Sequence, residues 1–147
     1  MEIYIGTKLI KAQPMMLNDA EEILKRKIQT KNEEGYLVEY EDGYKSWSPK
    51  DVFEKTYRKI DNLNFGMVIE ALKLGYKVAR NGWNGKGMFV YYVPGGDYAT
   101  QTEVAKKDFG ETAHYNPYLA IKTVNGAVST WVPSINDCLS EDWEIVK

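Results

Sequence analysis

Apolar and polar residues alternate through the first sixty residues in the pattern of half-buried β-strands. Three spaced aliphatic residues predict an opening strand that ends near Pro14: Ile3, Ile5 and Leu9. Between residues 35 and 47, two more alternating runs flank Asp42-Gly43, a dipeptide that type I′ turns favour. The pattern therefore predicts an antiparallel hairpin after the opening strand.

Two helices are expected beside these strands. Asn18 and Glu21 have the spacing of a capping box, in which two side chains bond free backbone amides at the start of a helix. Ser48-Pro49 begins the second helix, with serine as the N-cap and proline at the first helical position. We expect Trp47 to pack beneath this second helix. Residues 1–60 are thus predicted to form a small α+β module.

A new pattern begins after a boundary near residues 59–63. Four apolar residues at positions i, i+3, i+4 and i+7 predict a helix with a narrow buried stripe: Phe65, Val68, Ile69 and Leu72. Asn64 precedes this helix as an N-cap, and Gly75 follows it as a C-terminal stop. We expect a second domain that spans residues 63–147.

Alternating segments within the second domain predict its strands. They lie at residues 76–80, 88–93, 118–124, 127–132 and 143–146. Asn125-Gly126 predicts a second hairpin with a type I′ turn. Residues 94–117 are polar and weakly patterned, apart from a short helix predicted at 102–109, and so long a connection is typical of a functional lid or a disordered loop. The expected fold is α+β, with the helix packed on a mostly antiparallel sheet.

The composition narrows the function classes. The 147 residues are 44% hydrophobic and 13% aromatic, and the net charge of −2 argues against broad binding to a nucleic-acid polymer. No apolar run approaches the roughly 18 residues of a membrane span, and the N-terminus lacks the apolar segment of a signal peptide. The one cysteine, Cys138, fits a reducing cytosol, and the one histidine, His114, rules out a multi-histidine zinc site. We therefore expect no metal ion and no cofactor.

Residues 75–89 carry the densest chemistry of the chain. They include four glycines, one tryptophan and three cations, and no acidic residue interrupts the sequence from 71 to 96. Glycines let a ligand approach the backbone closely, and a flat aromatic ring beside cations suits a ligand with a base and phosphates. The same residues also suit an ordinary hairpin in which Trp83 anchors the core. The residue types alone leave both interpretations open.

Two separated groups of residues, in the right order, resemble a known phage family. The first group runs from Phe65-Gly66 and its helix to Val78-Ala79-Arg80-Asn81-Gly82-Trp83-Asn84-Gly85-Lys86-Gly87-Met88-Phe89. The second group consists of Tyr118-Leu119, Lys122, Asn125-Gly126, Trp131, Ser134, Asp137, Leu139 and Asp142-Trp143. Together they are similar to the phage Thoeris anti-defence sponges of the second type. The resemblance covers about 63–147, and residues 1–60 are instead similar to an N-terminal extension seen on assorted phage proteins.

The resemblance implies binding without catalysis in the cytoplasm of an infected bacterium. Members of this family sequester the cyclic ADP-ribose-type signal of a bacterial TIR protein, so that the downstream effector is not activated. Some relatives also capture cyclic oligonucleotide signals. The resemblance further implies a homo-oligomer, a dimer or a tetramer, with ligand pockets between protomers.

Nine residues carry over to this sequence as the implied ligand site. The walls that stack on the base or the ribose are Trp83 and Trp131. The phosphate partners are Arg80 and Lys86, with the amides of Gly85 and Gly87 nearby. The residues that read polar edges of the base and the ribose hydroxyls are Asn84, Ser134 and Asp137.

Other interpretations stay open. An enzyme that degrades the same signal would use a carboxylate such as Asp137 as its general base, although no paired-carboxylate or metal-ligand spacing supports it. A protein-binding inhibitor would use the aromatic residues of the N-terminal module: Tyr36, Tyr40, Tyr44 and Trp47. Single-stranded nucleic-acid binding is weakened by the net charge. Ser134 and Asp137 also have the spacing of a capping box for a short helix, which competes with a ligand role.

Overall fold

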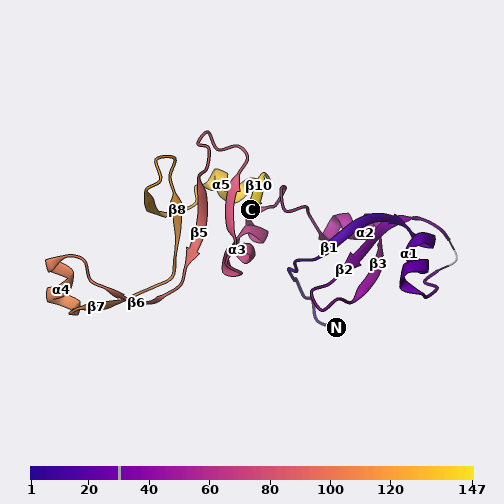
Figure 1. Ribbon diagram of the computed structural model, residues 1–147, viewed down its shortest axis with the longest axis horizontal. Helices are drawn as coiled ribbons and strands as arrows, with labels where there is room; N and C mark the ends of the chain where they lie inside the picture. Colours follow the sequence, from indigo (N-terminus) through magenta and orange to yellow (C-terminus); the bar gives the residue numbers. More distant parts are fainter. Residues whose placement is uncertain (30) are drawn as a thin grey trace. The chain divides into compact units, whose positions relative to one another are not determined.

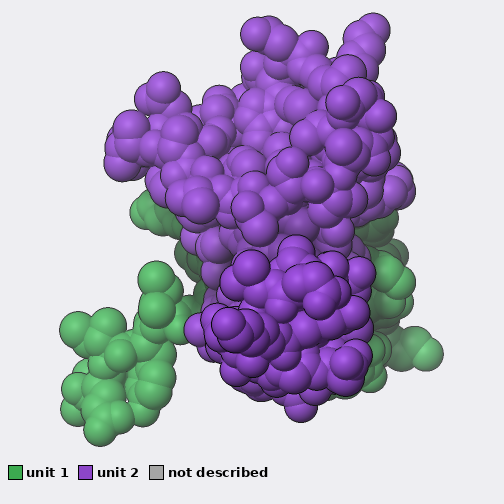
Figure 2. Space-filling model, turned by 90° about the vertical axis from the view of Figure 1, so that its left-hand side faces the viewer, with its two compact units in different colours: residues 1–58 green, residues 59–147 purple. Residues whose placement is uncertain are grey.

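The computed structural model describes residues 1–29 and 31–147 and divides the chain into two compact units. Unit 1 comprises residues 1–58 and unit 2 comprises residues 59–147, and Figure 2 colours them separately. Each unit contains an antiparallel sheet with helices packed on it. The predicted α+β class is therefore confirmed.

Unit 1 is a three-stranded antiparallel sheet with two helices packed against it (Figure 1). Its elements are β1 (Lys11–Met16), α1 (Leu17–Leu24), β2 (Glu34–Glu39), β3 (Lys45–Pro49) and α2 (Lys50–Thr56), and the strand order is β1-β2-β3. Leu37 and Trp47 pack with α1 residues in one core, whereas Tyr36 stacks on Phe53 of α2, with ring centroids 4.0 Å apart. Because successive strand residues point to opposite faces, the two helices cover opposite faces. Trp47 thus lies under α1, and the expectation that it packs beneath α2 is wrong.

The opening strand starts later than predicted. Residues 1–10 form neither helix nor strand, and Ile3 and Ile5 are fully exposed. β1 instead begins at Lys11 and continues through Pro14, which lies opposite Tyr36. A proline is tolerated there because β1 is an edge strand, so its missing amide removes no bond to a second neighbour.

Neither helix of unit 1 has the N-cap that the sequence predicts. α1 starts at Leu17, and its free amides are satisfied from outside the helix: the Leu17 amide donates to the Glu33 carbonyl at 3.0 Å, and the Asn18 amide to Asn32 Oδ1 at 3.0 Å. The predicted capping box of Asn18 is therefore wrong. α2 forms as expected, but its N-cap is Pro49, with no side-chain cap, rather than the serine before it.

The two predicted hairpins are present, but their turns are not type I′. In the first hairpin the Tyr40 amide donates to the Tyr44 carbonyl and the Gly43 amide to the Tyr40 carbonyl, both at 2.9 Å. In the second, Thr123 and Ala127 take the places of Tyr40 and Tyr44, and the glycine is Gly126. Only the glycine of each turn has a positive φ, of 82° and 85°, which is the pattern of a three-residue loop with a glycine bulge.

Unit 2 is built on a five-stranded antiparallel sheet in the order β10-β4-β5-β8-β9 (Figure 1). The strands are β4 (Lys77–Arg80), β5 (Phe89–Val93), β8 (Tyr118–Lys122), β9 (Val128–Trp131) and β10 (Trp143–Val146). α3 (Phe65–Lys73) covers one face, and the core between them contains Val68, Leu72, Val78, Val90 and Trp143. Asn64 caps α3 through the Met67 amide, and Gly75 ends it with φ 88°, so both predicted ends are confirmed.

Residues 94–117 are ordered structure that extends away from the five-stranded sheet (Figure 1). β6 (Gly96–Ala99) and β7 (Thr112–Tyr115) pair as a two-stranded ribbon, and α4 (Glu103–Phe109) closes its end. Thr102 caps α4 through the Ala105 amide, which confirms the predicted short helix. The interpretation of this segment as a lid or a disordered loop missed the ribbon, whose strands are too short for alternation to stand out.

Candidate functional site

The glycine-rich loop leaves the sheet at the end of β4 and returns to it at the start of β5. At the loop's start, a Cβ on Gly82 would lie 2.8 Å from Asp142 Oδ2, so a side chain there would displace the Asp142 carboxylate. At its end, Gly87 has a φ of 75°, a conformation that favours glycine. The loop therefore depends on its glycines to approach the segment before β10 closely and to turn back into β5.

Arg80, the last residue of β4, is held by two carboxylates. Its Nε donates to Asp142 Oδ1 at 2.8 Å and its Nη1 donates to Asp137 Oδ1 at 3.0 Å, and only 18% of its side chain is exposed. The hydrogen bond to Asp142, with the one to Asp137, raises the pKa of Arg80 despite burial. The same bond lowers the pKa of Asp142, against the effect of burial. All three groups are therefore charged at neutral pH.

Asp142 also fixes the beginning of the loop. Its Oδ2 accepts a hydrogen bond from the Gly82 amide at 2.9 Å, and its backbone carbonyl accepts one from the Asn81 amide at 3.0 Å. Asp142 belongs to the residues that carry the family resemblance, but the resemblance implies no ligand role for it. Its only signal in the sequence is a carboxylate beside a tryptophan, which does not reveal a partner 62 positions away.

Asp137 joins the short helix α5 (Ile135–Leu139) to the loop. With Ser134 it forms the capping box that was the alternative to a ligand role: Asp137 Oδ2 accepts from the Ser134 amide and hydroxyl, and Ser134 Oγ accepts from the Asp137 amide. Asp137 Oδ1 accepts from Arg80 and, at 3.4 Å, from Trp83 Nε1. Burial opposes ionisation of Asp137, but the bonds from Ser134, Arg80 and Trp83 outweigh it, so its pKa is lowered.

Three tryptophans meet beside this polar cluster. Trp83 contacts Trp143 and Trp131 edge to face, with ring centroids 5.4 and 6.3 Å apart. Trp143 is fully buried, and its Nε1 donates to the Asp137 carbonyl at 3.0 Å. Trp83 and Trp131, by contrast, are only partly buried.

The nine implied site residues fall into two groups. The structure brings one group together around the carboxylates: Arg80, Trp83, Trp131, Ser134 and Asp137. The other group continues along the loop beyond the tryptophan: Asn84, Gly85, Lys86 and Gly87. Asn84 and Lys86 are exposed, whereas a Cβ on Gly85 would collide with Val124. The residues of the first group hold one another in place through hydrogen bonds and ring contacts. In the second group, the Asn84 and Lys86 side chains are accessible to solvent.

The aromatic residues of unit 1 do not form one contact face. Trp47 is 9% exposed, and its Nε1 donates to the Met15 carbonyl at 3.1 Å, on the α1 side of the sheet. Tyr36 lies on the opposite side against Phe53. Successive residues of β2 and β3 point to opposite faces of the sheet. Trp47 therefore does not belong to the aromatic face that the sequence predicted for a protein partner.

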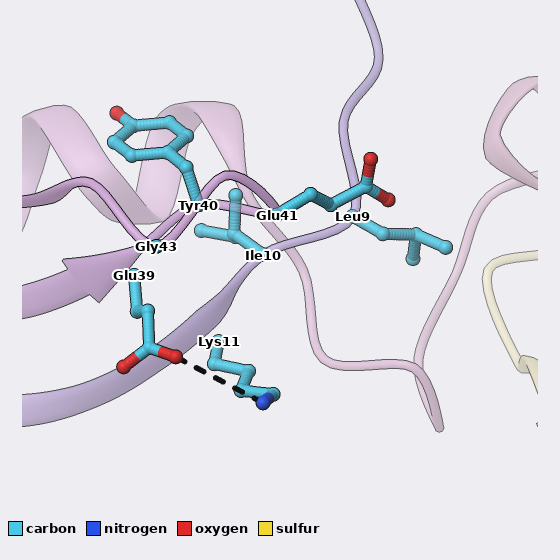
Figure 3. Close-up of a pocket in the computed structure, with 7 residues that line it drawn as sticks. All are labelled: Leu9, Ile10, Lys11, Glu39, Tyr40, Glu41 and Gly43. Carbon is cyan, nitrogen blue, oxygen red and sulfur yellow. Dashed lines mark ion pairs between the residues drawn. The ribbon is translucent and has the colours of Figure 1, made fainter.

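A separate open groove of about 250 Å³ lies on unit 1 (Figure 3). Its lining consists of Leu9, Ile10, Lys11, Glu39, Tyr40, Glu41 and Gly43. Lys11 and Glu39 form an exposed ion pair at 3.9 Å in this lining. Exposed pairs of this kind contribute little energy, and the groove shares no residue with the cluster on unit 2.

Within residues 1–29 and 31–147, no group of three or more His, Cys, Asp or Glu side chains is arranged to hold a metal ion. Among the helices of this described part of the chain, none is long and apolar enough to cross a membrane.

Comparison with known proteins concerns unit 2. The sequence model of a family described as the Thoeris anti-defense 2-like domain matches residues 63–146. A curated relative, Thoeris anti-defense 2 of Bacillus phage SP01, is 36% identical over 84 residues, which span 57% of this chain and 94% of the relative. The residues matched by the family model include the glycine-rich loop, the three tryptophans and the two carboxylates.

Proposed function

The chain belongs to the Thoeris anti-defense 2-like family, and we propose that its unit 2 binds and sequesters a cyclic ADP-ribose-type immune signal without cleaving it. The anti-defence role is that of the phage relative, Thoeris anti-defense 2. The signal itself is the one that the family resemblance implies. A protein with this role acts in the cytoplasm of the infected bacterium, where the signal is made.

The observation that carries this proposal is a partly exposed tryptophan fixed beside an exposed, cation-bearing loop. Trp83 is oriented by Asp137 and by two other tryptophans, so its ring is held in place before any ligand arrives. A fixed ring loses little entropy on binding. Stacking contributes roughly 1–3 kcal/mol per base, and a charge-assisted hydrogen bond from Lys86 to a phosphate adds roughly 1.5–3 kcal/mol.

The proposal divides the implied site residues by role. Trp83, Asn84, Lys86 and Trp131 contact the ligand, together with the amides of Gly85 and Gly87. The other residues position these contacts: Arg80, Ser134 and Asp137. Arg80 is engaged by two carboxylates, so we assign the phosphates mainly to Lys86 and the loop amides.

Binding without cleavage is supported by the state of Asp137. This carboxylate is the candidate general base of the enzymatic alternative. Both of its oxygens already accept hydrogen bonds, and its pKa is lowered although burial opposes ionisation. A base must take up a proton during the reaction, and a carboxylate stabilised in its ionised form is a poor one.

A homo-oligomer, either a dimer or a tetramer with pockets between protomers, is part of the proposal. Phe89 and Tyr91 alternate with the core residue Val90 on β5, so they lie on the sheet face that α3 does not cover. On α4, Val104 and Phe109 are 74% and 67% exposed. These apolar surfaces suit contacts between copies.

The test is to identify what the full-length protein retains. The purified protein is mixed with a panel of cyclic ADP-ribose isomers and cyclic dinucleotides, freed of unbound material and denatured, and the released molecules are identified by mass spectrometry. We expect an intact cyclic ADP-ribose-type molecule, with a cyclic dinucleotide as a second ligand. A chemically altered product would establish an enzyme, and the absence of any ligand would overturn the proposal in favour of a protein partner.

Substitutions of exposed residues distinguish an effect on ligand binding from an effect on folding in this test. Lys86→Ala should weaken binding by about 10- to 100-fold, because it removes one charge-assisted contact. Lys55→Ala removes an exposed lysine from α2 of unit 1 and serves as the matched control, with unchanged affinity. Asn84→Ala should also weaken binding without a loss of stability. If all three variants bind equally, the loop is not the site.

A further inference from the structure

Residues 2–8 are an exposed segment with the alternation of a β-strand. Tyr4 is 83% exposed, and Ile3 and Ile5 are 100% and 102% exposed, like residues of a free chain. The Tyr4 hydroxyl donates to the Glu2 carboxylate at 2.6 Å, which puts side chains two positions apart on the same side, as in a strand. The two isoleucines then share the opposite side.

The sheet of unit 1 offers this segment no neighbouring strand. β1 pairs with β2 from Met16 back to Lys11, and Lys11 lies opposite Glu39, the last residue of β2. After Glu39 the chain turns through residues 40–44 into β3. The residues before Lys11 thus extend past the end of their own partner strand, and such an unpaired run is a template for another chain.

We propose that residues 2–8 pair with the same residues of a second copy of this chain, as antiparallel strands centred on Ile5. In this register Glu2 of each copy lies opposite Lys8 of the other, so the two ends of the contact are each closed by opposite charges. A parallel pairing in register would place like charges opposite each other, which is unfavourable. Any other antiparallel register separates both charge pairs, so the sequence selects this one.

The remaining pairs fit the same register. Ile5 lies opposite its own equivalent, a pairing of β-branched residues that sheets favour. Tyr4 lies opposite Gly6, which has no side chain to compete with the ring for space. The Lys8 ammonium is exposed and lies 5.4 Å from the centre of the half-buried Tyr40 ring, a weak contact that Lys8 exchanges for the ion pair with Glu2 of the other copy. Two strands alone make a weak contact, and it is reinforced when other surfaces already hold the copies together.

Cysteine substitutions test the register in the full-length protein, with the one native cysteine removed by Cys138→Ser. In Ile5→Cys the two thiols lie directly opposite, within the Cα separation of about 4.4–6.8 Å that a disulfide needs. Ile3→Cys is the matched control: it is equally exposed, but its two equivalents are offset by four positions, about 13 Å. After mild oxidation with a copper(II) complex, we expect a crosslinked dimer from Ile5→Cys only. Equal crosslinking from both variants, or none from Ile5→Cys, overturns the proposal.

A charge exchange provides the second test. In the Ile5→Cys background, either Glu2→Lys or Lys8→Glu places like charges opposite at both ends and should lower the crosslinked fraction. The two substitutions together restore opposite charges and should restore the yield. A double variant that crosslinks no better than the single ones would show that these residues do not face each other. Neither residue lies in the ligand site proposed on unit 2, so the result is independent of ligand binding.

Discussion

Within the part of the chain that the structure describes, each unit has one carboxylate that is almost fully buried, and the two are stabilised in different ways. Glu21 of unit 1 is 8% exposed and Asp137 of unit 2 is 9% exposed. Glu21 Oε1 accepts from the Ile28 and Gln29 amides at 2.6 and 3.3 Å, so its partners follow within eight residues. Asp137 bonds to side chains of Arg80 and Trp83, which are 57 and 54 positions away.

Glu21 therefore makes hydrogen bonds that are local in the sequence, whereas Asp137 makes hydrogen bonds that hold the tertiary structure together. The Glu21 carboxylate satisfies backbone amides of the segment after α1, so it fixes the path of that one segment. The Asp137 carboxylate, together with Asp142, joins the end of β4, the glycine-rich loop and α5. Loss of Glu21 should therefore loosen a few residues, whereas loss of Asp137 should disturb the proposed site and the packing beneath it.

The largest effect on this difference between the units is expected when the tryptophan that donates to the Asp137 carbonyl is removed. Trp143→Ala should lower the free energy of unfolding of unit 2 by about 3–5 kcal/mol, because it empties the centre of the core and removes the bond to the Asp137 carbonyl. Hydrogen exchange of the full chain measures the effect in each unit. The counterpart is Trp47→Ala, which should reduce protection in unit 1 and leave unit 2 unchanged. A loss of protection shared by both units in either variant would contradict independent cores.

A smaller effect is expected when each of the two buried carboxylates is replaced by its amide. Asp137→Asn should cost unit 2 about 1–3 kcal/mol, since it withdraws an ionised acceptor from the Arg80 side chain, which is only 18% exposed. Glu21→Gln should raise hydrogen exchange mainly at residues 25–29, with little change in β2 and β3. The comparison fails if the Glu21 variant destabilises the whole of unit 1, or if the Asp137 variant changes only α5.

Acid should remove the stabilisation that ionised carboxylates give to both units, and the loss of stability should be larger in unit 2. The pKa of Glu21 is lowered first by the Ile28 amide, that of Asp142 first by Arg80, and that of Asp137 by bonds that outweigh its burial. Because each folded pKa lies below its unfolded value of about 4, the stabilisation is present at neutral pH and is lost as the pH falls through the folded pKa. Urea denaturation at a series of pH values from about 6 down to 2 should show this loss. Asp142→Asn should flatten the acid dependence of unit 2, and an unchanged slope would exclude this carboxylate as its source.

The elements that sequence reasoning found correctly are those encoded by neighbouring residues. The buried stripe of α3, its Asn64 cap and its Gly75 end all lie within a dozen residues, and both hairpins are marked by their turns. The strand predicted from Ile3 and Ile5 failed because alternation gives β-propensity without supplying a partner, and β2 ends at Glu39. The cap of α1 failed because Asn32 and Glu33 supply it from further along the chain.

The candidate site shows the same limit. The spacing of Ser134 and Asp137 predicted a capping box as one of two roles, and the capping box is present. No local pattern indicated that Asp137 also holds Arg80, or that Asp142 holds both Arg80 and the Gly82 amide. These contacts arise when antiparallel pairing brings β10 beside β4, which a pattern along the chain does not contain.

The smallest expected effect concerns a type of turn that occurs once in each unit, at residues 40–44 and at residues 123–127. In each hairpin the residue before the glycine does not adopt a positive φ but accepts a hydrogen bond from the backbone two positions on: Asp42 from the Tyr44 amide at 3.0 Å, and Asn125 from the Ala127 amide at 3.3 Å. The left-handed conformation is thus left to Gly43 and Gly126.

Gly43→Ala and Gly126→Ala should each therefore cost about 1–2 kcal/mol, the first in unit 1 and the second in unit 2. A Cβ would meet no atom within 4 Å at either position, so the cost is conformational and not steric. Gly66→Ala is the matched control, because this glycine lies in α3 with space for a Cβ 3.4 Å from Asn64 Oδ1, and it should be neutral or stabilising by up to about 1 kcal/mol. Denaturant unfolding resolves the three variants. Equal stability of all three would mean that the two turns relax to a conformation that alanine accepts.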